Sequence, residues 1–315
     1  MIHVAIHPSQ FPERVRAELI DSLRRREIRH KFHYDSYKQA QKWLAVHEAH
    51  SPARTDSNTH QIYGEAFEYV ADGLGGASVQ VIGLGCGGGQ KDVALLQKLS
   101  AAGCQSIYTA VDVSLPLVIT ARERAKAHAT QTRGLVCDLE VADDITDELC
   151  ECSASQRVFT FFGLVPNSEP DVILPRLARL LSRGDRLLLS ANLAPGPDYR
   201  TGVEHVLPQY DNALTGDWLF TFLSDLGVER GDGEVKFGIE EAKGLLRIRA
   251  DFQFSNARTI RLDDETFAFK PGERLRLFYS YRYTPDRLGA ELARHGLSIS
   301  KRWISSSGEE GVFLI

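Results

Sequence analysis

The sequence has few cysteines and no long apolar run. Its five cysteines are Cys86, Cys104, Cys137, Cys150 and Cys152. A small, odd number in a chain of this size argues against a disulfide framework. Cys150 and Cys152 are not followed by a second pair of ligands at zinc-site spacing, so we expect no metal site. Apolar stretches end well short of the ~18 residues that a membrane helix needs, and no secretory signal opens the chain. We therefore expect a cytoplasmic protein without a membrane partner.

Basic residues do not exceed acidic ones. The 315 residues include 37 Lys and Arg against 42 Asp and Glu, a formal charge of −5. A face that binds nucleic acid normally shows a basic surplus, so we expect no nucleic-acid partner. One basic cluster lies beside acidic residues, and we interpret it as a solvated helix face. This cluster consists of Arg24, Arg25, Arg26, Arg29 and Lys31.

The middle of the chain alternates between strand and helix signals. Strands are expected at residues 78–84, 106–113, 134–137, 157–162 and 186–192, and helices at 89–100, 115–129, 145–149 and 172–181. These strands are apolar throughout rather than alternating, which is typical of a sheet covered by helices on both faces. The pattern predicts an α/β fold with a doubly wound, Rossmann-like parallel sheet.

The two flanks of this alternation differ from it. Residues 1–76 are expected to be mostly helical, with Thr55 or Asp56 as N-cap of a helix through Tyr69. After the breakers Pro195-Gly196-Pro197, a helix at 215–226 precedes strands at 245–254 and 265–283. A helix at 286–295 and strands at 297–303 and 311–315 complete the chain. The predicted parts are an N-terminal segment (1–76) contributing to the substrate domain, a nucleotide-binding domain (77–194), an inserted α+β substrate or lid domain (195–284) and a C-terminal return to the sheet (285–315).

A glycine-rich loop, Gly83 to Gly89, joins the first of these strands to its helix. Bare backbone at a helix N-terminus favours a nucleotide, and we assign Gly85 and Gly87 to its binding. Glycines also serve tight turns, so the loop alone is weak evidence. Gly83, Gly85 and Gly88 have dinucleotide spacing, which keeps an NAD-dependent oxidoreductase open as an alternative.

Two acidic residues end the next two strands. Asp112 is placed to accept the ribose hydroxyls of an adenosine, a feature that NAD and S-adenosylmethionine (SAM) sites share. Asp138 is placed to accept from the adenine amino group while Leu139 covers the ring, which favours SAM. The alternative interpretation of either Asp is a helix N-cap.

Several segments in one order resemble the histidine Nα-methyltransferase family of ergothioneine biosynthesis. They are residues 84–91 (LGCGGGQK), 111–114 (VDVS), 163–167, Tyr210-Asp211-Asn212 with Gly216 and Phe220, Gly272-Glu273 with Ser280 and Tyr283, His33-Tyr34-Asp35 with 51–56, and 303–315. The resemblance runs from about residue 30 to the end. It implies a SAM cofactor, the product S-adenosylhomocysteine, a small amino-acid-like substrate and no metal.

The resemblance also implies roles for individual residues. Gly85, Lys91, Asp112, Asp138 and Leu139 would line the SAM site, with Lys91 as partner of the methionine carboxylate. Asn167 would hold the substrate amino group and Tyr210 its carboxylate region, which makes these two the candidate catalytic residues. From the residues alone, the preferred interpretation of Asn167 is a turn residue after Pro166.

Three departures from the family fall on the substrate side. Phe278 stands two residues before Ser280, where the family has a Glu that binds the histidine imidazole together with the serine. A buried polar ring without its partner costs about 1–3 kcal/mol, so we expect the substrate not to be histidine. His50-Ser51 replaces a tyrosine pair, and residues 163–166 replace a more polar run.

The candidate substrate residues are therefore His50, Asn167, Tyr210, Phe278 and Ser280. His50 is a candidate proton acceptor or substrate contact, with an ordinary surface residue as the alternative. The expected activity is methyl transfer to the α-amino group of another amino acid or derivative. A non-catalytic SAM-binding protein remains an alternative beside the NAD-dependent enzyme.

Overall fold

The computed structural model describes residues 3–51, 56–149 and 154–315. Cys150, Cys152, the candidate cap Thr55 and the Pro52-Ala53-Arg54 stretch lie outside the described residues. The other candidate cap, Asp56, accepts a hydrogen bond from the Asn58 backbone N–H at 2.9 Å and opens the helix that follows. Of the described helices, none combines the length and apolarity needed to cross a lipid bilayer.

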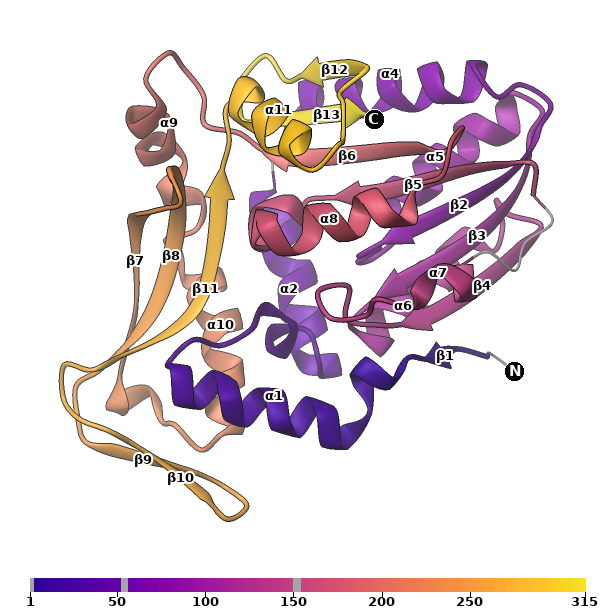
Figure 1. Cartoon of the computed structure of the whole chain (residues 1–315). Helices are drawn as coiled ribbons and strands as arrows, with labels where there is room; N and C mark the ends of the chain where they lie inside the picture. The colour runs from indigo at the N-terminus through magenta and orange to yellow at the C-terminus, as the bar shows by residue number, and fades with distance from the viewer. Residues whose placement is uncertain (1–2, 52–55, 150–153) are drawn as a thin grey trace.

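The central sheet has the order β1-β4-β3-β2-β5-β6-β13-β12 (Figure 1). Its strands are β1 (Ala5–Ile6), β2 (Ser78–Leu84), β3 (Gln105–Asp112), β4 (Gln131–Val136), β5 (Gln156–Phe162), β6 (Arg186–Asn192), β12 (Lys301–Ile304) and β13 (Glu310–Leu314). Strands β1 to β6 are parallel, β13 pairs antiparallel with β6, and β12 pairs antiparallel with β13. The predicted Rossmann-like α/β fold is confirmed.

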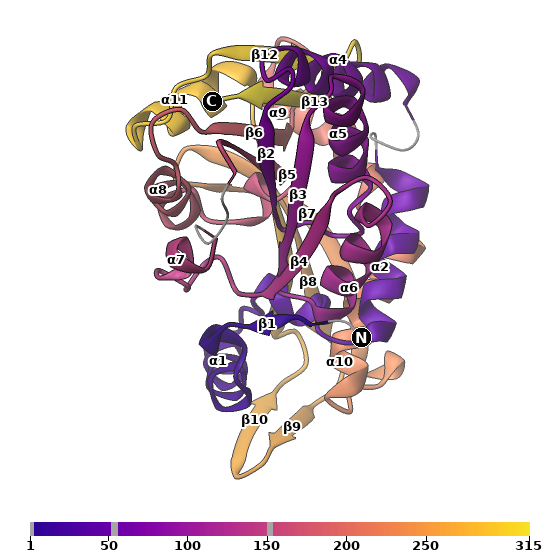
Figure 2. The same ribbon diagram turned by 90° about the vertical axis from the view of Figure 1, so that its right-hand side faces the viewer.

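Helices cover both faces of this sheet, as its apolar strands require (Figure 2). On one face lie α4 (Ser57–Asp72), α5 (Gln90–Ala101) and α6 (Leu115–Ala125). On the other lie α7 (Ile145–Leu149), α8 (Pro170–Leu180) and α11 (Pro285–Arg294). Each face has its own buried cluster, with Leu95 and Val118 in one and Leu174 and Phe161 in the other. These two layers hold the strand ends in a fixed arrangement.

A second, antiparallel sheet faces the carboxyl ends of the central strands (Figure 1). It consists of β7 (Gly233–Ala242), β8 (Leu245–Phe254) and β11 (Arg274–Arg282), and the hairpin of β9 (Arg258–Leu262) and β10 (Glu265–Phe269) projects from it. Around it are α1 (Pro12–Arg25), α2 (Tyr37–His50), α9 (Tyr199–Val206) and α10 (Ala213–Asp225). Short 3-10 turns are η1 (Pro8–Gln10), η2 (His30–His33), η3 (Val165–Asn167), η4 (Leu207–Gln209) and η5 (Arg230–Asp232). Phe252 and Leu275 of the sheet share a core with Leu23 of α1 and Leu219 of α10.

The flanks differ from the prediction at several elements. The strand expected at 265–283 is two strands, because Pro271-Gly272 forms a turn in which Gly272 has φ +86°. Strands β7 and β9 were not predicted, and the strand expected at 297–303 is the shorter β12. The N-terminal segment, expected to be mostly helical, also supplies β1 to the central sheet. The division of the chain into four parts stays a prediction.

Candidate active site

A cavity of about 290 Å³ lies where the central strands end. Its lining includes the last residues of three strands, Leu84 of β2, Asp112 of β3 and Asn192 of β6, and Asp138 just after β4. Residues of η2, α2, α10 and β11 close it from the other side. The carboxyl edge of a doubly wound sheet is where such folds bind ligands. The sequence-predicted residues that line it are His50, Gly85, Gly87, Lys91, Asp112, Asp138, Leu139, Asn167, Tyr210 and Phe278.

The loop between β2 and α5 favours glycine at two of the predicted positions. Gly85 has φ +62°, and a Cβ there would lie 1.8 Å from the Leu164 side chain. Gly87 has φ +52°, and a Cβ there would lie 2.9 Å from Trp43. Positive φ and close neighbours both disfavour larger residues. The loop therefore presents bare backbone to the cavity just before the N-terminus of α5.

Asp112 is buried at the end of β3. Its Oδ2 accepts a hydrogen bond from the Gly87 N–H at 3.0 Å, and its Oδ1 accepts from the Ser114 N–H at 2.9 Å. Burial raises the pKa of this carboxyl to about 6, against the lowering effect of these backbone hydrogen bonds. Each carboxylate oxygen can accept a further hydrogen bond, so Asp112 retains acceptor capacity toward the cavity.

Asp138 is also buried in the lining, but the chain itself engages both of its oxygens. Oδ1 accepts a hydrogen bond from the Glu140 N–H at 2.9 Å. Oδ2 pairs with Arg29 at 3.1 Å and with Lys31 at 3.2 Å, and both cations also pair with Glu18. An adenine amino group would share Asp138 with these two cations.

The interpretation of the basic cluster as a solvated helix face is wrong for Arg29 and Lys31. Helix α1 ends at Arg25, and Arg26 at φ 58° turns the chain inward. Lys31 is then buried and Arg29 is partly buried, and both line the cavity. Their acidic partners Asp138 and Glu18 come from separate segments, which neither charge counting nor helical spacing reveals.

Lys91 lies in the first turn of α5 and lines the cavity. Its ammonium group donates to the Tyr63 hydroxyl at 2.5 Å and pairs with Glu310 at 3.3 Å. Tyr63 in turn hydrogen-bonds Glu310. Tyr63 of α4 and Glu310 of β13 thus orient Lys91. A ligand carboxylate that binds Lys91 would become the fourth member of this hydrogen-bonded group.

Asn167 and Tyr210 both line the cavity. The Asn167 amide N–H donates to the Gly163 carbonyl at 3.4 Å, which directs its Oδ1 away from that carbonyl. Oδ1 is buried and has no hydrogen-bond partner among the described residues. The Tyr210 hydroxyl is 3.1 Å from Ser280 Oγ, which places the fully buried Ser280 behind Tyr210. His50, the last residue of α2, lines the same cavity.

Aromatic rings form the wall on which Phe278 lies. Phe278 is 4% exposed, with His30 stacked at 4.8 Å, Tyr210 at 6.1 Å and Trp218 edge-on at 5.9 Å between ring centroids. Tyr34 and Trp43 extend this wall along α2. No site role was predicted for His30, Tyr34, Trp43 or Trp218, although Tyr34 lies within a stretch that resembles the family.

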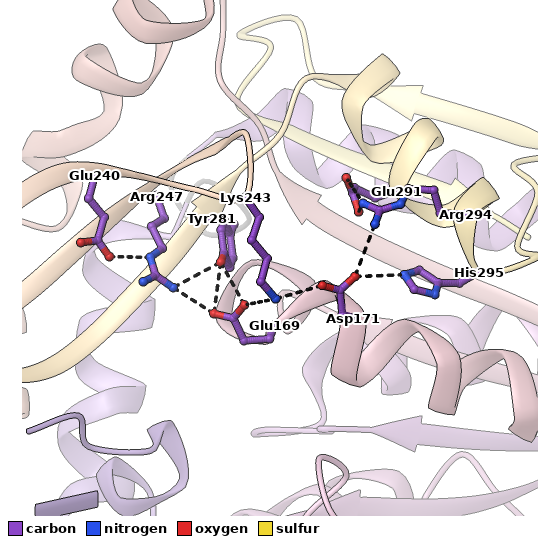
Figure 3. A network of polar contacts seen from close by, with 9 residues as sticks. All are labelled: Glu169, Asp171, Glu240, Lys243, Arg247, Tyr281, Glu291, Arg294 and His295. Carbon is purple, nitrogen blue, oxygen red and sulfur yellow. Dashed lines mark hydrogen bonds and ion pairs between the residues drawn. The ribbon is translucent and has the colours of Figure 1, made fainter. Parts of the chain in front are cut away.

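A polar network ties the turn that carries Asn167 to the second sheet (Figure 3). Glu169, two residues after Asn167, pairs with Arg247 of β8 at 2.9 Å and accepts from the Tyr281 hydroxyl of β11 at 3.1 Å. Arg247 also pairs with Glu240 of β7 at 2.6 Å, and Lys243 bridges Glu169 to Asp171 of α8. Arg247 is buried, so its ion pair with Glu169 holds the segment after η3 in a fixed position relative to the second sheet.

The chain matches the model of one protein family, described as SAM-dependent, histidine-specific methyltransferase, over residues 15–213 and 239–315. The chain belongs to this family. It is therefore a SAM-dependent methyltransferase, and the hypotheses of an NAD-dependent oxidoreductase and of a non-catalytic SAM-binding protein are wrong. The search of curated proteins found no match.

Solved structures similar to this methyltransferase have low sequence identity. The 1,6-didemethyltoxoflavin-N1-methyltransferase of Burkholderia thailandensis is 13% identical, with 88% of this chain and 87% of that chain covered and a TM-score of 0.43. The mitomycin 7-O-methyltransferase MmcR is 16% identical, with 97% and 68% covered and a TM-score of 0.44. The plantazolicin methyltransferase BpumL is 13% identical, with 72% and 83% covered and a TM-score of 0.40.

The residues of this methyltransferase fit SAM. The glycine loop offers backbone where side chains would intrude, and Asp112 offers a carboxylate at the adjacent strand end. SAM supplies a methyl group already activated by its sulfonium. What remains for the chain is to hold an uncharged nucleophile in line and to exclude water. Among residues 3–51, 56–149 and 154–315, no three His, Cys, Asp or Glu side chains cluster as metal ligands.

Proposed function

We propose that this methyltransferase transfers the methyl group of SAM to the α-amino group of an amino acid, or of a close derivative, that carries an aromatic or apolar side chain. In this proposal it is a cytoplasmic enzyme of small-molecule metabolism, and histidine is a poor substrate. Gly85, Gly87, Lys91, Asp112, Asp138 and Leu139 bind the cofactor. His50, Asn167, Tyr210, Phe278 and Ser280 serve the substrate.

The observation that carries the amine assignment is the Asn167 side-chain oxygen. This atom is buried, accepts no hydrogen bond within the described chain and belongs to a residue of the cavity lining. A buried acceptor without a donor costs about 1–3 kcal/mol, and a substrate N–H group would remove that cost. One hydrogen bond to Asn167 also leaves the nitrogen lone pair free to point at the methyl group. Asn167 therefore serves to orient the nucleophile.

The aromatic wall supports the choice of side chain. Phe278 offers no hydrogen-bond acceptor, and burial lowers the pKa of the stacked His30 to about 3, so that this ring is uncharged at neutral pH. An apolar or aromatic side chain gains burial and edge-to-face contacts against Phe278, Trp218 and Tyr34. An imidazole would lose hydrogen bonds to water without replacement. The wall thus favours phenylalanine-like or tryptophan-like substrates over histidine.

The incoming ammonium group must lose a proton before it attacks. His50 is our candidate acceptor, since it lines the cavity at the end of α2. If His50 takes the proton, His50→Gln lowers kcat most near neutral pH, where an imidazole can accept a proton and the amine is still protonated. The kcat of the variant then recovers as the pH approaches the pKa of the free amine. If it is only a surface residue, the pH profile of kcat does not change.

The test is methyl transfer from SAM to each of the twenty amino acids and to their N-methyl forms, read by mass spectrometry. We expect Phe, Tyr or Trp to exceed histidine at least tenfold in kcat/KM, and the product to carry the methyl group on the α-nitrogen. Preference for histidine would contradict the assignment of side chain. Methylation at another atom would contradict the role of Asn167.

A further inference from the structure

Arg282, at the end of β11, is a buried cation without an anionic partner. Its side chain is 1% exposed and lines the cavity. Its Nη1 donates to the Leu193 carbonyl at 3.3 Å and its Nη2 to the Tyr210 hydroxyl at 2.8 Å, and its Nε has no partner. None of the ion pairs between described residues includes Arg282.

This arrangement is costly for a charged group. Removing a guanidinium from water requires compensating charge or a full set of hydrogen bonds. Arg247, the other buried arginine of the second sheet, shows the usual solution, because it pairs with both Glu169 and Glu240. Arg282 has only two neutral acceptors on the described chain. Since it borders the cavity, the position for its missing anion is inside the cavity.

The neighbours of Arg282 indicate which end of the cavity this is. Nη2 and the Asn192 amide both donate to the Tyr210 hydroxyl oxygen, at 2.8 Å and 3.1 Å. Two donors occupy the acceptor positions of that oxygen, so the Tyr210 hydrogen points to Ser280 or into the cavity. Asn192 ends β6, which β5 separates from the glycine loop after β2. Arg282 therefore lies on the side of the cavity away from the glycine-rich loop, Gly83 to Gly89.

We propose that Arg282 binds the carboxylate of the substrate and makes the enzyme select amino acids over the corresponding amines and amides. The inference rests on the proposed function and identifies the residue that recognises the carboxylate of its substrate. Arginine presents several N–H groups in a plane that suits a carboxylate, and the Tyr210 hydroxyl supplies a further donor beside it. With Asn167 holding the amine, each of the two polar groups on the substrate Cα has its own partner.

The experiment compares matched acids, amides and amines with four proteins. The substrates are L-phenylalanine, L-tryptophan, their carboxamides, phenethylamine and tryptamine, with SAM saturating. The proteins are the wild type, Arg282→Gln, Arg282→Lys and the control Arg287→Gln, which removes an exposed arginine five positions along the chain. Steady-state kcat and KM are measured, and affinity for S-adenosylhomocysteine is measured by calorimetry.

We expect the wild type to prefer each acid over its amide by about 30-fold or more in kcat/KM, chiefly through KM. Arg282→Gln should remove that preference by losing activity on the acids and not on the amides, Arg282→Lys should keep part of it, and Arg287→Gln should match the wild type. Affinity for S-adenosylhomocysteine should not change. The comparison of acids with amides on the wild-type enzyme tests the proposal even if the Arg282 variants do not fold.

Three results would overturn the proposal. Equal use of acid and amide by the wild type would do so while leaving N-methylation intact. A loss of S-adenosylhomocysteine affinity in folded Arg282→Gln would assign the arginine to the cofactor carboxylate instead. Absence of methylation on every acid, amide and amine would contradict the proposed function, and this inference with it.

Discussion

His30 lies nearly parallel to Phe278, with ring centroids 4.8 Å apart and an angle of 20° between the planes. The imidazole is held in place, because its Nε2 accepts a hydrogen bond from the Tyr279 N–H at 3.1 Å. Burial keeps the ring neutral, with a pKa of about 3. Where the family resemblance leads one to expect an imidazole-binding Glu, this chain has a neutral aromatic pair that joins its N-terminal segment to β11.

Phe278→Glu should shift the substrate preference toward histidine. The new carboxylate offers an imidazole N–H an acceptor, worth about tenfold per 1.4 kcal/mol of differential transition-state binding. We expect the ratio of kcat/KM for histidine over phenylalanine to rise at least tenfold. Phe278→Leu, which removes the ring without adding an acceptor, should leave histidine use unchanged.

The substrate preference of Phe278→Glu is informative only if the variant folds. Phe278 belongs both to the cavity lining and to the buried core of the second sheet, so the variant will also lose stability. Circular dichroism establishes whether Phe278→Glu is folded. A folded variant with the wild-type preference would mean that Phe278 does not contact the substrate side chain.

Asp112→Ala should weaken binding of S-adenosylhomocysteine by about 10- to 100-fold, since charge-assisted hydrogen bonds to the ribose are lost. Because burial raises the pKa of Asp112 to about 6, wild-type affinity should also fall as the pH drops below that value. Calorimetry at pH 5 and pH 8 measures both effects. Asp72→Ala, on an exposed position of α4, serves as control. An unchanged dissociation constant in Asp112→Ala would remove this residue from the cofactor site.

Asn167→Ala should separate binding of the cofactor from turnover. The residue lies on η3 and is not among the predicted cofactor residues, so affinity for S-adenosylhomocysteine should stay within about twofold of the wild type, whereas kcat should fall about 100-fold through lost orientation of the amine. Calorimetry and single-turnover assays measure the two quantities. Asn256→Ala, at an exposed turn, is the matched control. Parallel losses of affinity and turnover would indicate a structural role.

The central sheet could be predicted from the sequence because its strands are buried on both faces. Residues 78–84 and 186–192 are apolar runs bounded by turn residues, and they are β2 and β6 without change at either end. Strand β7 (GEVKFGIEEA) has many charged residues and is only partly buried, so it lacks this signal. Its place depends on pairing with β8, which the local sequence does not encode.

The candidate site was only partly predictable for a similar reason. Glycines and acidic residues at strand ends are recognisable because strand order brings them to one edge of the sheet. We interpreted Arg29 and Lys31 as part of a solvated helix face and predicted no role for Arg282. Only the fold shows that all three are buried or partly buried beside the cavity. Phe278 was predicted as a site residue only through the family resemblance, since a phenylalanine in a strand is otherwise an ordinary core residue.

Asp92 provides a test of how burial of a carboxyl affects stability. This residue of α5 is 2% exposed, and its two oxygens accept hydrogen bonds from the Tyr108 hydroxyl at 2.6 Å and the Thr160 hydroxyl at 2.7 Å. Burial outweighs these contacts and raises its pKa from 3.8 to about 6. The folded protein therefore holds this proton to a higher pH than the unfolded chain does.

The sign of the stability effect follows from linkage. Below pH 4 Asp92 is neutral in both states, and its ionisation makes no difference to the free energy of unfolding. As the pH rises through about 6 the unfolded chain is already ionised, so folding must bury a charge, at a cost of up to about 3 kcal/mol above pH 7.

Asp92→Asn removes this charge and keeps both contacts, because hydroxyl groups can either donate or accept. We expect the variant to exceed the wild type in free energy of unfolding by about 3 kcal/mol at pH 8 and by less than about 1 kcal/mol at pH 4. Urea denaturation at pH 4, 6 and 8 measures the difference, with the exposed Asp72→Asn as control. A difference between the variant and the wild type that stays constant across this range would mean that Asp92 does not ionise on the transition from pH 4 to pH 8.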